Sequence, residues 1–542
     1  MNKSAETRKV WIGAALIAVT LVGVQPAIAQ IGTVSVTGGR IEGVTTDGVT
    51  SFKGIPFAAP PVGDLRWRAP QPVRPWEGVR KADHFGAECM QGTFNRPGAP
   101  PGPVPSEDCL YLNVWTTAKS ADAHLPVMVW IYGGSFMGGS GSQPAYDGTH
   151  FAQKGVVLVN LNYRLGVFGF LADHELDAES PHHVSGNYGV EDMLAALKWV
   201  KANIARFGGD PSRVTVFGES AGALSVGILS VSPPAKGLFQ RAISESGGAP
   251  LSPPPPEDAS YSVVAPFPSL SSAEAMGQAF LAKLGAQDIA AARALPAEAL
   301  LKAQPGLSIN PVQDGYILPT DAYQRFHSGR VNNTPILVGT NSNEGAFRPF
   351  RAQFTGMTPE KFETRVHAAF GKYADQILAD YPHATPAEAE QAAEDLFFRD
   401  TALAWKTWAW ARAQAQTGHD KAYLYYFDRR SPQEPLGPAH TAEIPYVFGS
   451  VGQSGARAFG PAGPPLPSDV PLSQQMQSYW VNFAKSGDPN GPGLPHWPAF
   501  SVSSPQVMYL DAESHAGPVP NLNKLEVIDA YFRSLREEEK KK

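Results

Sequence analysis

Cysteine is almost absent from this chain, which has only Cys89 and Cys109 among its 542 residues. Neither has a second cysteine or a histidine at zinc-ligand spacing, so we expect no zinc site at these cysteines. An even count favours one disulfide if the chain reaches an oxidising compartment, and two unpaired buried thiols are the alternative. The Pro- and Gly-rich loop between them cannot hold itself by a hydrophobic core. Its closure would stabilise the protein by about 3 kcal/mol.

Charge is also sparse, and no basic cluster is present. Charged residues make up 17% of the chain, and 44 basic side chains face 50 acidic ones, which gives a net charge of -6. No stretch interleaves basic and aromatic residues, so we expect no nucleic-acid partner. The hydrophobic fraction of 43% is that of a globular protein with a large core. No internal repeat is visible.

No apolar run reaches the length of about 20 residues that a membrane-spanning helix needs. At the N-terminus, three basic residues precede the apolar residues 10–24, and Ala-Ile-Ala follows at residues 27–29. This order is typical of a secretory signal peptide. We predict cleavage after Ala29, export to the periplasm or the medium, and no stable membrane insertion. An uncleaved N-terminal membrane anchor is the alternative.

The most informative motif is Gly-x-Ser-x-Gly at residues 218–222, with Ser220 at its centre. Strand-forming residues 214–217 precede it, a turn is predicted at residues 208–211, and residues 221–229 are compatible with a helix. A strand, sharp turn and helix around this motif are typical of a nucleophile elbow, which exposes the serine hydroxyl above a sheet. Gly218 and Gly222 would remove side chains that clash across the turn. The structural alternative is a glycine-rich turn with a buried serine.

Short apolar runs alternate with helical patterns along the rest of the chain. Strands are predicted at residues 127–132, 156–161, 241–244, 336–339 and 422–427, and a long helix at residues 189–207. The alternation predicts an α/β fold with a mostly parallel central sheet and helices on both faces. Helical patterns dominate residues 271–412 and predict insertions over the active site, whereas the Pro-rich residues 251–270 predict an exposed excursion. We expect one domain over residues 30–542.

A serine nucleophile needs a general base, an acid that orients the base, and donors for an oxyanion. Seven histidines follow Ser220, and His440 is favoured because it lies in a Gly/Pro-containing loop. Glu344 is the favoured acid because it directly follows a predicted strand, at the sheet edge where α/β catalytic groups gather. The residues alone leave the other histidines and acids open. Backbone amides of the glycine-rich residues 133–135 and of Ala221 are candidate oxyanion donors, although a glycine pair after a strand can also be a plain turn.

Together these residues resemble the type-B carboxylesterase family, which includes cholinesterases and bacterial para-nitrobenzyl esterases. Similar segments cover nearly the whole mature chain, at residues 52–70, 106–115, 132–136, 162–171, 186–211, 343–347, 439–449 and 480–490. The resemblance implies an α/β-hydrolase fold without metal or organic cofactor. It implies Ser220 as nucleophile, Glu344 as acid, His440 as base, oxyanion donors at Gly134, Ser135 and Ala221, a Cys89–Cys109 disulfide, and supporting roles for Glu219, Ser246 and Glu443.

Two departures from the family pattern bear on the substrate. Ser135 stands where the family usually has a third glycine, so its hydroxymethyl group would narrow the oxyanion hole or contact substrate. The disulfide loop has no tryptophan, whereas cholinesterases place their choline-binding tryptophan there. A quaternary ammonium substrate is therefore not expected, because its cation–π partner is missing.

The predicted function is hydrolysis of small-molecule carboxylic esters through an acyl-enzyme. An amidase or peptidase on the same fold and a non-catalytic binding protein are the competing functions. Bulky, xenobiotic or polycarboxylate esters are the expected substrates. Arg96, Arg348 and Arg351 suggest a further hypothesis, in which cations near the site mouth favour esters of acidic or polycarboxylic acids. Solvated surface charges are the alternative interpretation of these arginines.

Overall fold

A computed structural model of the protein describes residues 31–92, 102–252, 267–307, 309–347, 351–417, 419–453 and 464–539. The predicted signal peptide, Arg96, Arg348 and most of the Pro-rich excursion lie outside the described residues. Among the helices that are described, none combines the length and the apolar character required to cross a bilayer.

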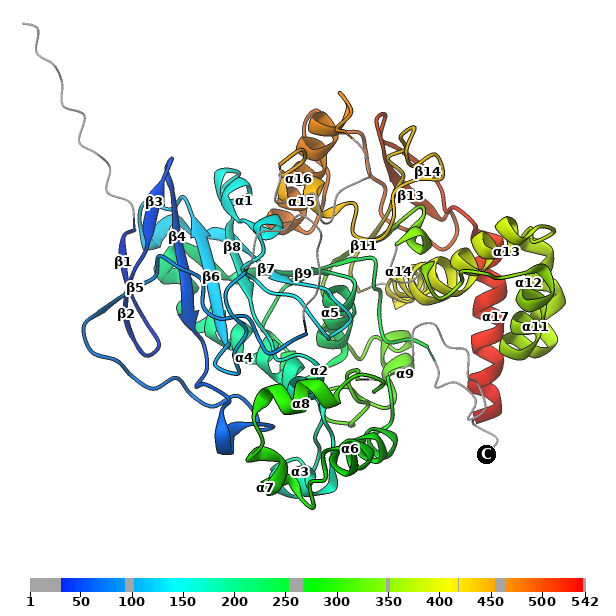
Figure 1. The fold of residues 1–542 in the computed structure, drawn as a ribbon. Helices are drawn as coiled ribbons and strands as arrows, with labels where there is room; N and C mark the ends of the chain where they lie inside the picture. Colours follow the sequence, from blue (N-terminus) through cyan, green and yellow to red (C-terminus); the bar gives the residue numbers. More distant parts are fainter. Residues whose placement is uncertain are drawn as a thin grey trace, which may run out of the picture.

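An eleven-stranded sheet forms the centre of the molecule (Figure 1). Its strands are, in spatial order, β14 (His515–Pro518), β13 (Gln506–Leu510), β12 (Ala422–Phe427), β11 (Ile336–Asn341), β10 (Arg241–Glu245), β9 (Gly209–Glu219), β7 (Leu125–Ile131), β8 (Val157–Leu161), β6 (Tyr111–Thr116), β4 (Val49–Pro56) and β3 (Val44–Thr46). From β13 to β8 every neighbouring pair is parallel, and the strands beyond them pair antiparallel. A small second sheet contains β1 (Thr33–Val36), β2 (Gly39–Glu42) and β5 (Val79–Lys81).

Helices cover both faces of the large sheet, as expected for the predicted α/β-hydrolase fold, which the structure confirms. They are α1 (Thr149–Gln153), α2 (Gly166–Phe170), α3 (His174–Glu179), α4 (Tyr188–Asn203), α5 (Ala221–Val231), α6 (Leu270–Leu284), α7 (Ile289–Arg293), α8 (Ala297–Ala303), α9 (Ala322–His327), α11 (Pro359–Phe370), α12 (Ala374–Asp380), α13 (Pro386–Ala393), α14 (Trp405–Thr417), α15 (Ile444–Phe448), α16 (Asp469–Ser486) and α17 (Leu522–Glu539). A π-helical segment, η8 (Glu394–Ala404), joins α13 to α14.

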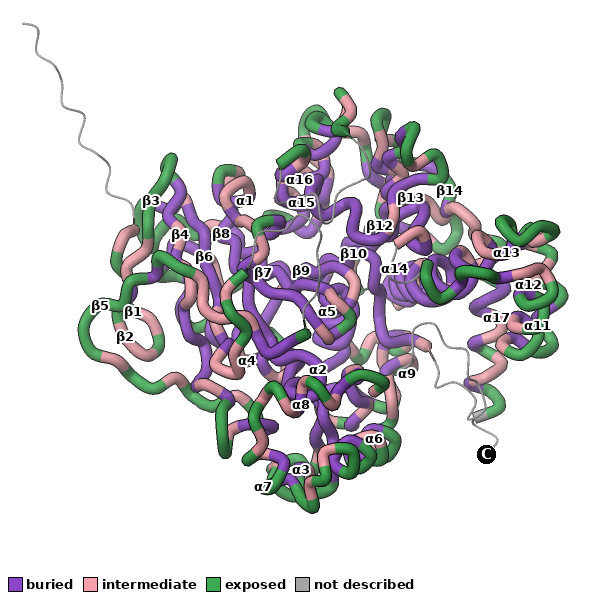
Figure 2. The backbone as a smooth tube through the Cα atoms, viewed as in Figure 1, coloured by how far each residue is buried: buried purple, intermediate pink, exposed green. Residues whose placement is uncertain are grey.

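The central strands lie close to the residues predicted for them. They were recognisable in the sequence because strands that are buried on both faces consist mainly of apolar residues. Strands β8 and β11 are buried along their whole length, and β12 spans the predicted residues without change. Figure 2 shows buried backbone through β7, β9 and β10, and exposed backbone at the outer strands β3 and β5. Continuous apolar runs are the expected sequence pattern of such doubly covered strands.

The predicted turn at residues 208–211 is wrong in extent. Only Gly208 turns, with a φ of +77°, and β9 already begins at Gly209 and runs through Pro211. The pairing of β9 with β7 changes register between Leu125 and Val127. This irregular stretch tolerates a proline, which has no N–H for a regular ladder.

Cys89 and Cys109 form the predicted disulfide. Both residues are buried, and the bond ties the start of the Pro- and Gly-rich loop to the segment before β6. Backbone contacts add to this link, since the N–H of Ser106 donates to the carbonyl of Glu88 at 2.8 Å.

Candidate active site

Ser220 occupies a sharp turn between β9 and α5. Its φ of +56° and ψ of -122° lie outside the regions that residues with a Cβ usually adopt. The turn is tight because Gly218 and Gly222 press on β7: a Cβ on Gly218 would lie 2.5 Å from the carbonyl oxygen of Ile131, and one on Gly222 would overlap the same backbone. The Ser220 N–H donates to the carbonyl of Glu245 in β10 at 2.9 Å, which anchors the strained residue.

Glu344 and His440 meet Ser220 in a continuous hydrogen-bonded chain. His440 Nε2 lies 2.8 Å from Ser220 Oγ, and His440 Nδ1 lies 2.6 Å from Glu344 Oε2. The other oxygen of Glu344 accepts the N–H of Asn341 at 2.8 Å. Glu344 is completely buried and His440 is 3% exposed, so little water competes for these bonds.

The sheet explains how residues so distant in sequence meet. Ser220 follows β9 and Glu344 follows β11, and both strands flank β10. Their carboxyl ends lie at one edge because the strands are parallel. His440 lies in the segment between β12 and α15, beyond the carboxyl end of the next strand in the sheet.

Carboxylates govern the charge of His440. Burial by itself would lower the pKa of the imidazole, but Glu219 and then Glu344 outweigh burial and raise the pKa of His440 to about 9. Glu219 Oε1 lies 3.2 Å from His440 Nε2, the nitrogen that also faces Ser220. The site therefore favours an imidazolium over the neutral ring.

Two further glutamates lie buried behind these residues. Burial and the nearby Glu344 raise the pKa of Glu443 to about 7, and Glu443 Oε2 accepts a hydrogen bond from the Asn341 amide at 2.5 Å. Burial also holds the pKa of Glu245 well above its usual range, although this carboxyl accepts the indole N–H of Trp480 at 2.8 Å. Both carboxyls therefore tend to keep a proton in the folded protein.

The loop after β7 approaches Ser220 closely. A Cβ on Gly133 would lie 2.8 Å from Ser220 Cβ. Gly134 has a φ of +115°, and Ser135 and Phe136 have φ values of +57° and +58°, which are uncommon for residues with side chains. Ser135 is exposed whereas Phe136 is buried. The loop is thus held in a strained conformation beside the serine, with the Ser135 hydroxymethyl group open to solvent.

Ala221, the third candidate oxyanion donor, is the first residue of α5 and is buried. The first amides of a helix point outward along its axis at the positive end of the helix dipole. Its N–H is therefore suited to stabilise negative charge next to Ser220.

Aromatic rings flank His440 on the side of the helical insertions. Phe347 and Phe398 approach the imidazole edge-on, with ring centroids 5.5 Å and 5.6 Å away. Phe398 belongs to the π-helical segment η8, whose first residue, Glu394, packs against Gly345. Glu394 pairs with Arg351 at 3.0 Å, so the charge of this exposed arginine is balanced.

Residues that could hold a metal ion lie elsewhere. His174, Asp177 and Glu274 come from α3 and α6, and His174 Nδ1 already pairs with Glu274 Oε1 at 2.9 Å. None of the residues around Ser220 belongs to this group.

The structure brings together Ser220, Glu344 and His440, as the sequence analysis expected, and places Glu219 and Glu443 beside them. Ser246, also expected near the site, follows β10 with a φ of +54° and is completely buried.

Sequence reasoning missed Asn341, Glu245, Trp480, Phe347 and Phe398. Asn341 ends β11, two residues beyond the predicted strand at residues 336–339, and Trp480 begins one of the segments that resemble the family, so both positions carried a signal. Phe398 lies in a helical stretch without any motif, and nothing local indicated it.

Comparison with known proteins gives consistent matches along the chain. The model of the "Carboxylesterase family" matches residues 30–528. A fumonisin B1 esterase of Sphingopyxis macrogoltabida is 41% identical over 85% of this chain and 83% of its own length, and a para-nitrobenzyl esterase of Bacillus subtilis strain 168 is 36% identical over 88% and 94%. A solved PNB esterase structure superposes with a TM-score of 0.80 at 34% identity, covering 92% of this chain and 99% of that chain.

Proposed function

The chain belongs to the carboxylesterase family and is a carboxylic ester hydrolase, and on that premise we propose that it cleaves esters with a Ser220–His440–Glu344 triad. The observation that carries the proposal is the buried chain of hydrogen bonds from Glu344 through His440 to Ser220. It has the geometry needed for a hydroxyl to lose its proton as it attacks.

In the first half of the reaction, Ser220 Oγ forms a bond to the ester carbonyl carbon while its proton moves to His440 Nε2. The carbonyl oxygen becomes an oxyanion, which we assign to the amides of Gly134, Ser135 and Ala221. Collapse of this adduct breaks the bond to the alcohol oxygen. The alcohol leaves with the proton from His440 Nε2, and an acyl-enzyme remains.

In the second half, water replaces the alcohol. His440 takes a proton from the water as its oxygen bonds to the acyl carbon, and returns that proton to Ser220 Oγ when the acid leaves. Glu344 holds the Nδ1–H and stabilises the imidazolium in both halves. Since the base works only when neutral, the raised pKa of His440 predicts a rate that increases into the alkaline range.

The test is turnover of a short-chain nitrophenyl ester by the Ser220→Ala variant. We expect loss of at least about 10⁴-fold in kcat with an unchanged melting temperature, because the nucleophile is removed and the fold is kept. Ser503→Ala, at an exposed position, is the matched control. Mass spectrometry after treatment with a phosphonate ester should locate the adduct on Ser220. An active Ser220→Ala enzyme, or an adduct elsewhere, contradicts the assignment.

Amide and peptide bonds are the competing substrates, because the triad does not itself select the leaving group. The same enzyme preparations can be given a nitroanilide with the same acyl group. We expect a kcat/KM for the nitrophenyl ester that exceeds that of the anilide. The opposite order would make the protein an amidase.

For the physiological substrate we propose a bulky or xenobiotic carboxylic ester. Support comes from the names of the two relatives, which act on fumonisin B1 and on para-nitrobenzyl esters. A preference for polycarboxylate esters would need a cation at the site mouth, and Arg351 is already paired with Glu394. Hydrolysis of matched neutral and polycarboxylate esters by the wild type and by Arg351→Ala decides this point: equal preference in both enzymes excludes a role for Arg351.

We further propose that residues 1–29 direct export and that residues 30–542 form one catalytic domain. The disulfide supports an oxidising destination, and the large sheet draws strands from residue 44 to residue 518, which supports a single unit. Sequencing the N-terminus of the protein recovered outside the cytoplasm should give Gln30. A retained Met1 would contradict cleavage.

A further inference from the structure

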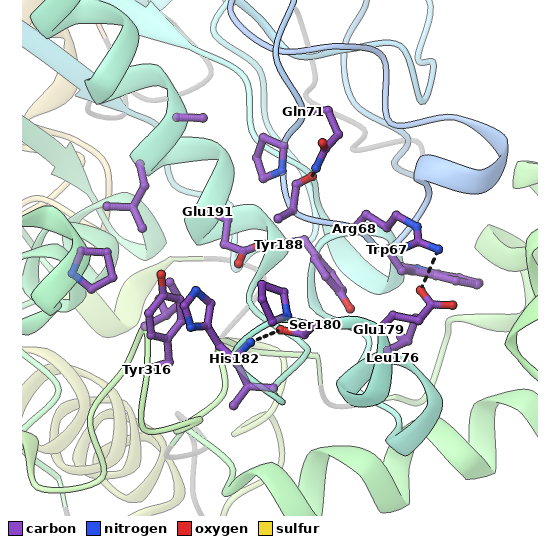
Figure 3. Close-up of a pocket in the computed structure, with 18 of the residues that line it drawn as sticks. Trp67, Arg68, Gln71, Leu176, Glu179, Ser180, His182, Tyr188, Glu191 and Tyr316 are labelled. Carbon is purple, nitrogen blue, oxygen red and sulfur yellow. Dashed lines mark hydrogen bonds and ion pairs between the residues drawn. The ribbon is translucent and has the colours of Figure 1, made fainter.

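A cavity of about 320 Å³ lies away from the triad, between the N-terminal half of α4, the segment after α3 and the loop that contains Trp67. Figure 3 shows its lining. Its volume is at the lower end of the range for small-molecule sites. None of the residues assigned to catalysis lines it, so the ester hydrolase reaction leaves this cavity unexplained.

Glu191 is the unusual side chain of this cavity. It projects from α4, and Figure 3 shows its carboxylate between His182 on one side and Tyr188 on the other. One of its oxygens, Oε2, is buried and has no hydrogen-bond partner among the described residues. Burial raises the pKa of this carboxyl to about 7. This oxygen is costly to the folded protein when the carboxyl is charged, because it has lost water and gained no hydrogen-bond partner, although the residue as a whole is only half-buried.

Glu179, the other carboxylate of the lining, already has cationic partners. Glu179 pairs with Arg293 at 2.5 Å and with Arg68 at 3.3 Å. Lys198, two turns along α4 from Glu191, is exposed, and no ion pair between the two is seen. Glu191 is therefore the lining carboxylate that an incoming cation could satisfy.

Aromatic rings supply the rest of the surface. His182 and Tyr316 stack with ring centroids 3.6 Å apart, and Trp67 and Tyr188 line the cavity from other elements (Figure 3). Arg164 lies over the ring of Tyr188 at 5.3 Å, so that ring already has a cation. The His182–Tyr316 pair remains as a flat face for an apolar body, next to the carboxylate.

We propose that this cavity is a second ligand site that binds a small primary ammonium compound with an aromatic or apolar body. The ammonium group donates to the Glu191 carboxylate, and the body packs against the stacked rings of His182 and Tyr316. A neutral molecule of the same shape gains the packing but leaves Glu191 without a cation. The charge of the ligand, rather than its shape alone, decides binding.

Calorimetric titration of the full mature enzyme with 2-phenylethylammonium tests the proposal, and 2-phenylethanol serves as the neutral probe. Ser220 is first blocked with a phosphonate, and an untreated sample is run in parallel, so that binding near the triad is recognised. We expect equal ammonium affinity in both samples and at least tenfold weaker binding of the alcohol, because a hydrogen bond to a charged group exceeds a neutral one.

Glu191→Gln keeps the shape of the side chain and removes its charge. It should weaken ammonium binding at least tenfold, whereas Glu526→Gln, at an exposed position on α17, should leave it unchanged. Lys198→Met should strengthen binding, since it removes a competing cation. Equal affinities of ammonium and alcohol, unchanged binding in Glu191→Gln, or no heat at all, which would mean a cavity that holds only water, each overturns the proposal. The probe comparison and Lys198→Met decide it even if Glu191→Gln does not fold.

Discussion

Glu219→Gln is the substitution that examines the electrostatics of the site most directly. Glu219 is 2% exposed at the end of β9, and its Oε1 lies 3.2 Å from His440 Nε2. Glutamine has the same size, so the variant removes a charge without creating a cavity. Glu344 and the other buried glutamates remain in place.

The expected magnitude follows from the distance. An opposite charge this close raises the pKa of a buried group by about 1 to 3, and each factor of ten in the acid constant corresponds to about 1.4 kcal/mol. The wild-type pKa of His440 is raised to about 9 against the effect of burial, and the charge of Glu219 is the largest single influence that raises it. In Glu219→Gln the imidazolium is less stable, so the pKa of His440 falls by about 1 to 3.

The direction of the pH effect is then fixed. A base is active in its neutral form, which exists above its pKa, so the acid limb of kcat/KM should move to lower pH in Glu219→Gln. The plateau rate should fall about tenfold or more, since the imidazolium of the transition state loses the same stabilisation.

The assay is a pH profile of kcat/KM for a nitrophenyl ester, measured on wild type, Glu219→Gln and the exposed control Glu526→Gln. The control should reproduce the wild-type profile. An acid limb that stays in place or moves to higher pH in Glu219→Gln would refute the reasoning, because it would mean that Glu219 does not set the charge of His440.

Three other variants test how the scaffold holds the site. Replacing Cys89 and Cys109 together by serine should lower the free energy of unfolding by about 3 kcal/mol, seen as a lower denaturation midpoint that reductant no longer changes. Gly222→Ala should abolish ester turnover and lower the melting temperature, because its Cβ overlaps the backbone of β7; a fully active variant would contradict the tight elbow. Asp192→Ala should lower the free energy of unfolding by about 3 to 5 kcal/mol, because the buried Arg164 loses the carboxylate that lies 2.8 Å away. Denaturant titration measures this change, and an unchanged free energy of unfolding would show that water replaces the carboxylate.

The sequence predicted the centre of the sheet better than its edges, for a physical reason. Strands such as β8 and β11 are buried on both faces, so each contains a run of adjacent apolar residues that stands out from any helical pattern. Strand β3, at one edge of the large sheet, and β5, in the small second sheet, are short and exposed, and nothing in their composition marks them. The sequence did not predict the start of β9, because Pro211 normally indicates a turn. Here the pairing of β9 with β7 is irregular, and an irregular pairing can include a proline.

The catalytic constellation was only partly predictable. The sharp turn at Ser220 depends on local sequence, and it could be predicted from the five residues of the motif and the strand before them. The meeting of His440 with a serine 220 residues away and with an acid 96 residues away depends on the order of strands in the sheet. Local periodicity carries no information on strand order. The resemblance to known esterases supplied these partners, and the position of Phe398 became apparent only in three dimensions.

The buried glutamates around His440 have a consequence that neither the motif nor the triad implies. Glu443 has a pKa of about 7 and Glu344 is its neighbour, so Glu443 changes from neutral to charged as the pH passes through neutrality. Its charge raises the pKa of His440 in turn. Glu443 is therefore already charged at the higher pH, near 9, at which His440 loses its proton, and its carboxylate contributes to the strength of this base. Below neutral pH Glu443 is protonated and this contribution is lost, so the strength of His440 as a base depends on a carboxyl that is completely buried behind the triad.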